Sequence, residues 1–192
     1  YRQLNNQEEP DGALLKCALL NTANDMGNAG PDFQYGWGHV NAYRAYKLLE
    51  EKRYTSKSIE NGEQQSHTVV VNDNVKEVRF MLYWADRAPS LLAKSALVNN
   101  LDLQVSDPTG KVFLPWVLDT TPKATNLDRP ATNGIDNLNN VEQVLIKNPV
   151  QGTYNIVING KIIPQGPQTY YLAQEFIENN DLILTYPTGR KS

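Results

Sequence analysis

The segment Leu101–Gly110, LDLQVSDPTG, decides the fold class because it joins a strand pattern to a turn. Leu101, Leu103 and Val105 alternate with polar residues, as in a strand with one buried face. The final four residues, DPTG, fit a type I turn with proline at the second position and glycine at the fourth. The segment therefore predicts a half-buried strand that ends in a tight turn.

Similar runs recur through most of the chain that follows residue 65, and polar turn sequences separate them. The runs are SHTVVV, KEVRFMLYW, NNLDLQVSD, KVFLPWVLD, VEQVLIKN, GTYNIVING and TYYLAQEFI. Short strands spaced in this way predict a mainly β fold, an antiparallel β-sandwich. The exception is the long polar stretch 118–140, and a loop of that length is usually functional or held by something.

The first part of the chain, residues 1–53, has a helical pattern instead. Apolar residues at 3.6-type spacing predict helices over 11–22 and 40–53, with Asp11 and Asn41 as N-caps. Between them lies the hinge segment YGWGHVNAYRAY, residues 35–46, whose two glycines allow the backbone to bend.

Composition limits the class of protein. The 192 residues carry a net charge of −3 and no run of Lys and Arg, so nucleic-acid binding is not expected. No apolar run approaches the roughly 20 residues that span a bilayer. The single cysteine, Cys17, excludes an internal disulfide or a zinc cluster, and its apolar surroundings predict a helix-core position.

Two motifs in the helical part, in the right order, resemble the last part of the catalytic domain of subtilisin-like serine proteases (subtilases). That family has an L-x-N-T-A element, then a Y-G-x-G-x-V-N-A turn and a closing helix. The matching residues here are Leu20, Asn21, Thr22 and Ala23, then Tyr35, Gly36, Gly38, Val40, Asn41 and Ala42. The resemblance implies that residues 1–53 are the tail of an α/β catalytic domain.

The second part resembles the jelly-roll β-sandwich domain that follows the protease domain in one branch of bacterial subtilases. The resemblance rests on LYWAD, LVNNLDLQVSDPTG, NNVEQVLIKNPVQGTYNIVING and PQGPQTYYLA. Where such domains commonly have L-V-N-D-L-D-L, this chain has Asn100 in place of the first aspartate. The expected division is an incomplete catalytic domain (1–53), a β-sandwich (54–178) and a linker or further module (179–192).

No catalytic residue is expected in this chain. A subtilase needs Asp, His and Ser, and the family's serine lies in G-T-S-M-A, which is absent here. The two histidines, His39 and His67, are not near a glycine-elbow serine and are interpreted as structural. The resemblance implies a secreted parent endopeptidase, extracellular or at the cell surface. Its triad and specificity pockets would lie upstream, and its substrate would be peptide or protein.

Calcium is the one cofactor that the sequence suggests. Calcium takes six to eight oxygen ligands, and a pool of them lies in or beside the long loop: Asp102, Asp119, Asp128, Asp136, Asn137, Asn139, Asn140 and Glu142. The resemblance points the same way and carries over Asp102 and Asp136. With Asp119 and Asn140 they form the predicted ligand set. The alternative is that these side chains only cap turns.

Two other functions remain open. A β-sandwich can bind carbohydrate or protein, and Tyr83, Trp84 and Trp116 are the candidate aromatic platform. The domain can also be a structural spacer. In each case the apolar faces of the two helices need a cover, which can be the sandwich, a second copy of the chain or a companion chain.

Overall fold

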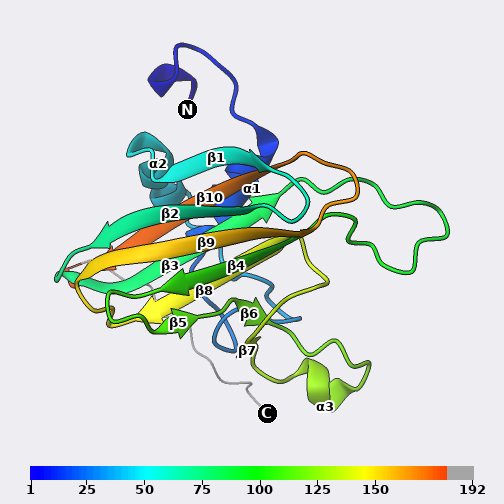
Figure 1. The fold of residues 1–192 in the computed structure, drawn as a ribbon. Coiled ribbons are helices and arrows are strands. Elements are labelled where there is room, and N and C mark those ends of the chain that lie inside the picture. Colours follow the sequence, from blue (N-terminus) through cyan, green and yellow to red (C-terminus); the bar gives the residue numbers. More distant parts are fainter. Residues whose placement is uncertain (181–192) are drawn as a thin grey trace.

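The computed structural model describes residues 1–180 and shows two four-stranded antiparallel sheets packed face to face (Figure 1). The first sheet consists of β1 (Tyr54–Ile59), β10 (Gln168–Glu178), β3 (Val75–Trp84) and β8 (Val141–Lys147), in that spatial order. The second sheet consists of β2 (Gln64–Val71), β9 (Gly152–Ile162), β4 (Asn100–Ser106) and β5 (Val112–Phe113). This is the strand order of a jelly roll, so the expected mainly β sandwich is confirmed.

The core lies between the two sheets, and the alternation of β4 places its apolar residues there. Leu101, Leu103 and Val105 are at most 2% exposed, while the residues between them face outward. Trp84 on β3 is fully buried in the same core. The predicted turn after β4 also forms, since the Gly110 N–H donates to the Asp107 carbonyl at 3.0 Å.

The predicted strand KVFLPWVLD is wrong as a single element. A proline has no N–H to donate to a sheet, and Pro115 separates β5 from a short strand, β6 (Trp116–Val117). β6 pairs with β7 (Thr132–Asn133) in a small hairpin apart from both sheets. The long loop 118–140 therefore holds β7 and one short helix, α3 (Ala124–Leu127).

Both predicted helices form, with narrower bounds. After a short 3₁₀ turn, η1 (Arg2–Leu4), come α1 (Gly12–Asn21) and α2 (Ala42–Glu50). The caps are confirmed: the Asp11 carboxylate accepts from the Ala13 N–H at 2.7 Å, and Asn41 Oδ1 accepts from the Arg44 N–H at 3.1 Å. Among residues 1–180, no helix is long and apolar enough to span a membrane.

The two helices lie together on the outer face of the first sheet (Figure 1). Their buried side chains form a second apolar cluster with residues of β3 and β10: Leu14, Cys17, Ala18, Leu48, Leu49, Met81, Tyr83, Tyr171 and Ala173. The sandwich itself is therefore the cover for these faces of the helices. Cys17 is buried as expected, and this burial raises the pKa of its thiol.

The hinge segment folds back on the end of α1. Asn24 and His39 exchange two backbone hydrogen bonds of 2.8 Å, and Gly38 has a positive φ of 101° beside them. A side chain on residue 38 would place its Cβ 2.1 Å from the Asn24 oxygen, which explains the glycine. We expected Tyr43 and Tyr46 to pack α2 down, but they are 71% and 47% exposed, because α2 turns another face to the sheet.

Candidate functional site

The asparagine of the L-x-N-T-A motif lies at the contact between α1 and the sandwich. Asn21 ends α1 and is fully buried. Its Nδ2 donates to the Ala173 carbonyl of β10 at 3.2 Å, and its Oδ1 accepts from Gln143 Nε2 of β8 at 3.0 Å. A longer bond of 3.5 Å runs from Nδ2 to the Arg79 carbonyl of β3, so this single side chain joins the helix to three strands of the first sheet.

Arg79 of β3 strengthens the same contact from the sheet side. It is 8% exposed, and its Nη1 donates to the Ala23 carbonyl at 2.7 Å, just past the end of α1. Its Nε donates to Glu77 at 2.6 Å, so the buried guanidinium has a carboxylate partner. We call Asn21, Arg79 and Gln143 the anchor. A buried polar group is tolerated only when it is hydrogen-bonded, and the anchor satisfies this condition for Asn21.

A second group of polar residues lies where β4 meets β8. Glu142 is 1% exposed and its Oε2 accepts from the Leu103 N–H at 2.6 Å. Burial raises the pKa of Glu142 well above its usual value, and the Asp102 and Asp136 carboxylates raise it further. Lys161 pairs with Asp102 at 3.0 Å and partly offsets this negative charge.

Three oxygens of this region are buried without a hydrogen-bond donor among the described residues: Asn100 Oδ1, Asp102 Oδ1 and Glu142 Oε1. Unpaired buried oxygens carry a free-energy cost, and a cation would remove it. Within residues 1–180, however, no group of three His, Cys, Asp or Glu side chains has a geometry that could hold a metal ion.

The predicted calcium ligands divide between two places. Asp102 and Asp136 both lie near Glu142, which the sequence placed in the oxygen pool but not in the ligand set. Asp119 lies elsewhere, on the exposed loop, where it accepts from the Thr121 N–H at 2.9 Å and from Asn126 at 3.1 Å. Asn140 donates to the Trp84 carbonyl at 2.7 Å. The side chain of Asp119 caps a turn, as the alternative interpretation had it.

The histidines occupy separate parts of the fold. The backbone of His39 belongs to the hinge segment, and its side chain is exposed. His67 of β2 lies 2.8 Å from the hydroxyl of Tyr170, which donates to Gln65 at 2.6 Å. Desolvation lowers the pKa of His67, with a smaller contribution from Lys57.

The candidate aromatic platform does not assemble. Trp84 is fully buried in the core and Tyr83 is 7% exposed beneath the helices. Trp116 is half-buried, and its ring lies against Gly30. The three aromatic side chains therefore present no common exposed face for a sugar ring.

Comparison with known proteins gives one significant relative in sequence. In an alignment of 173 positions that covers 84% of this chain, the sequence is 27% identical to the serine protease/ABC transporter B family protein tagA of Dictyostelium discoideum. The chain spans only 10% of the length of that protein. No protein-family profile matches the chain.

Among solved structures, the chain is similar to Bacillus licheniformis lipase BlEst2 in its propeptide form. The TM-score is 0.39 and the identity 18%, over 66% of this chain and 22% of the lipase chain. A likeness of this size supports no argument about function. The chain is thus a jelly-roll sandwich with two docked helices, and it is similar in sequence to part of a protein named as a serine protease.

Proposed function

We propose that this chain is the C-terminal region of a secreted subtilisin-like serine endopeptidase and that it stabilises the catalytic domain of that enzyme. The observation that carries the proposal is the anchor. The motif residue Asn21, which the subtilase resemblance assigns to the catalytic domain, is buried and hydrogen-bonded to strands of the sandwich. The aligned 84% of the chain is longer than either part alone, so the similarity to tagA includes both helical and sandwich residues.

In this proposal the parent enzyme cleaves peptide bonds through a serine acyl-enzyme, and this chain supplies no triad residue. Its partner is the upstream catalytic domain. Apolar side chains left exposed on and after α1 offer a surface for that domain: Leu19 (38%), Phe33 (49%), Tyr35 (49%) and Val40 (57%). Contiguous exposed apolar residues commonly mark such interfaces. Self-association of the isolated chain through the same residues is a further expectation.

A fluorophosphonate probe, which labels activated serines, tests the proposal. We expect the upstream gene sequence to encode a Gly-Thr-Ser turn and the full-length protein to be labelled. We expect the 192-residue chain to remain unlabelled and to hydrolyse no peptide. Labelling of the isolated chain, or peptide hydrolysis by it that is lost in His39→Ala, would refute the absence of a triad.

We propose calcium as a structural cofactor bound beside Asp102, Asp136, Glu142 and Asn100. The three carboxylates would have to move together to bind the ion, because in the described residues they do not form a metal-binding group. The support is the three buried oxygens without donors, since a hard cation pairs best with carboxylate and amide oxygens. The ion would neutralise the negative charge of the cluster. It would also fix the end of the long loop, at Asp136, to β4 and β8.

Thermal melts of the chain with calcium and with a chelator test this second proposal. Calcium at a hundred times its Kd stabilises the folded state by about 2.7 kcal/mol. We expect Glu142→Gln to lose this response and Asp119→Asn, the matched control, to keep it. Equal midpoints with and without chelator would exclude calcium. A response lost equally in Asp119→Asn would place the ion elsewhere.

A further inference from the structure

The connection between β3 and β4 extends beyond the end of the sandwich (Figure 1). Its residues 87–96, RAPSLLAKSA, are all exposed, the longest such run in residues 1–180, and we call them the β3–β4 loop. At the centre of this loop Leu91 and Leu92 are 104% and 95% exposed. Two adjacent leucines therefore stand in solvent, outside both apolar clusters, where a pocket of another protein can take them.

The backbone of the β3–β4 loop is weakly held. Among the described residues, 88–96 make one backbone hydrogen bond, from the Ala93 N–H to the Ser90 carbonyl at 3.0 Å. A segment with so few hydrogen bonds opens locally at a small free-energy cost. An endopeptidase must draw an extended segment into its active-site cleft, so exposed loop tips of this kind are preferred sites of cleavage.

The long loop 118–140 is also exposed in places, but it is better tied to the rest of the fold. It contains α3, and Asp128 at the end of α3 bonds to the helical part of the chain. Asn28 Nδ2 donates to the Asp128 carbonyl at 3.0 Å, and Gln34 Nε2 donates to the Asp128 carboxylate at 3.2 Å. Of these two loops, the β3–β4 loop is therefore the more accessible to a protease.

The base of the β3–β4 loop, by contrast, is firmly closed. The two carboxylate oxygens of Asp86 accept from the Val98 N–H at 2.7 Å and from the Asn99 N–H at 2.9 Å. The Asn99 carbonyl accepts from Nε1 of the buried Trp84 at 2.9 Å. These bonds join the end of β3 to the start of β4, so a cut at the tip of the loop leaves its base in place.

A cut in the β3–β4 loop would leave β1, β2 and β3 in a first fragment and β4 to β10 in a second. The jelly-roll topology pairs every strand of the first fragment with strands of the second: β1 with β10, β2 with β9, and β3 with both β10 and β8. Within residues 1–180, no two of β1, β2 and β3 are neighbours in a sheet. The fragments can therefore separate only if every one of these strand pairs breaks.

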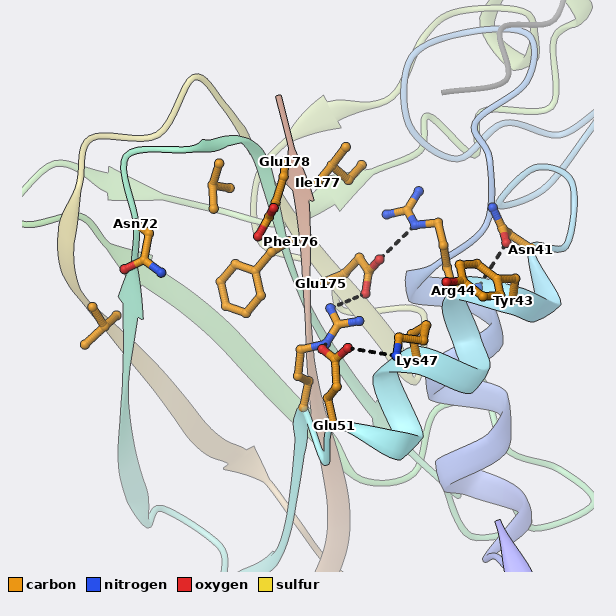
Figure 2. A pocket seen from close by; sticks show the side chains of 13 residues that line it. Asn41, Tyr43, Arg44, Lys47, Glu51, Asn72, Glu175, Phe176, Ile177 and Glu178 are labelled. Carbon is orange, nitrogen blue, oxygen red and sulfur yellow. Dashed lines mark hydrogen bonds and ion pairs between the residues drawn. The ribbon is translucent and has the colours of Figure 1, made fainter. Parts of the chain in front are cut away.

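Side chains also join the two fragments. Asn21 of the first fragment and Gln143 of the second share a buried hydrogen bond of 3.0 Å. Figure 2 shows Arg44 of α2 directed at Glu175 of β10, with which it forms an ion pair at 2.8 Å. The core between the sheets is built from residues of both fragments. A cut chain thus keeps the contacts that hold the sandwich together.

We propose that the β3–β4 loop is a proteolytic processing site, cut after Leu91 or Leu92 by an endopeptidase with an apolar specificity pocket. In this reaction water adds across the peptide bond, so the leucine gains a free carboxylate and the next residue gains a free amine. The product is a two-chain form in which the sandwich stays folded. The inference is independent of the proposed protease function, because the cut requires no triad in the parent protein.

Terminal analysis of the full-length protein, isolated from its natural source, tests the processing. We expect mass spectrometry to find a new N-terminus at Leu92 or Ala93. The cut protein should run as one species on a native gel and as separate fragments on a denaturing gel. A protein whose β3–β4 loop is intact, or fragments that separate under native conditions, would refute the proposal.

Chymotrypsin, which cuts after large apolar side chains, is the probe for the isolated chain. Its first cut within residues 1–180 should follow Leu91 or Leu92. Tyr43 is also 71% exposed, but it lies in α2, and a helix does not fit an active-site cleft that binds extended chain. The two fragments should elute together from a sizing column in buffer and apart in urea. A first cut elsewhere in residues 1–180 would overturn the site.

A double variant, Leu91→Ser with Leu92→Ser, tests the role of the apolar side chains. Serine does not fill an apolar pocket, so chymotrypsin should cut this loop about tenfold or more slowly. The matched control is Leu138→Ser, which changes a leucine that is 54% exposed on the long loop and should leave the rate unchanged. Trypsin, which cuts after Lys94, should act equally on all three proteins because the loop stays open. Equal chymotrypsin rates in the two variants, or resistance of the loop to trypsin, would contradict the inference.

Discussion

Substitution of Asn21 by alanine measures how firmly the helical segment is fixed to the sandwich. The change removes two buried hydrogen bonds of ordinary length, to the Ala173 carbonyl at 3.2 Å and from Gln143 Nε2 at 3.0 Å, and a longer one of 3.5 Å to the Arg79 carbonyl. Each of the two shorter bonds is worth about 1 kcal/mol net. It also leaves the buried Gln143 amide without its acceptor, which costs about 1 kcal/mol or more.

Alanine returns about 0.5 kcal/mol through its higher helix propensity, so the expected loss of unfolding free energy is about 2.5 kcal/mol. For a chain of this length, 1 kcal/mol lowers the Tm by about 2–4 °C. We therefore expect the Tm of Asn21→Ala to fall by about 5–10 °C. Circular dichroism melts and urea titrations give both quantities.

The matched control is Asn74→Ala, an exposed asparagine in the turn before β3, which should change stability by less than about 0.5 kcal/mol. A double-mutant cycle of Asn21→Ala with Gln143→Leu should show a coupling of about 1 kcal/mol, because the two side chains share a hydrogen bond. If Asn21→Ala melts like the control, or if the cycle shows no coupling, the anchor does not exist in solution.

Three other substitutions test the hinge segment, the environment of His67 and the ion pairs of Glu175. Gly38→Ala should cost more than about 2 kcal/mol in a urea titration, because of its clash and positive φ, whereas Gly36→Ala, with open space around its Cβ, should cost about 1 kcal/mol. The folded-state pKa of His67 is depressed, so its neutral form favours folding. Stability should fall as pH drops through about 6.5 toward the lower folded pKa, and His67→Gln should show a smaller fall in melts across this range. Glu175→Gln should lose about 3 kcal/mol in urea titrations, because it removes the buried carboxylate that pairs with both Arg44 and Arg53. The reasoning would be contradicted if the two glycine variants cost the same, or if His67→Gln had the same pH response as the unchanged protein. An unchanged urea midpoint in Glu175→Gln would contradict it as well.

Local patterns in the sequence predicted the parts of the fold that depend on neighbouring residues. The alternation of Leu101, Leu103 and Val105, the caps Asp11 and Asn41 and the turn after β4 all depend on short-range chemistry, and all form. The alternation of apolar and polar residues did not predict β1, because its sequence, YTSKSI, is largely polar. As an edge strand it buries only Ile59 fully.

Contacts between distant residues were harder to predict. The sequence left three covers open for the helices, since nothing near Asn21 says that its amide bonds to residues 122 and 152 positions away. The sequence identified the oxygen-bearing residues, but only the packing of the two sheets, which brings β4 of one beside β8 of the other, places Asp102 near Glu142. Asp119 caps a separate turn on the exposed loop.

The anchor also bears on how such a module can be inherited. A boundary drawn at residue 53 would separate Asn21 from Gln143 and Arg79, and it would expose the outer surface of the first sheet. Recombination between genes that moved residues 54–178 alone would transfer a domain in which Arg79 and Gln143 have lost their hydrogen-bond partners in the helical segment. The unit that keeps its buried contacts begins before Asp11, so we expect the two helices and the sandwich to be inherited together as one unit.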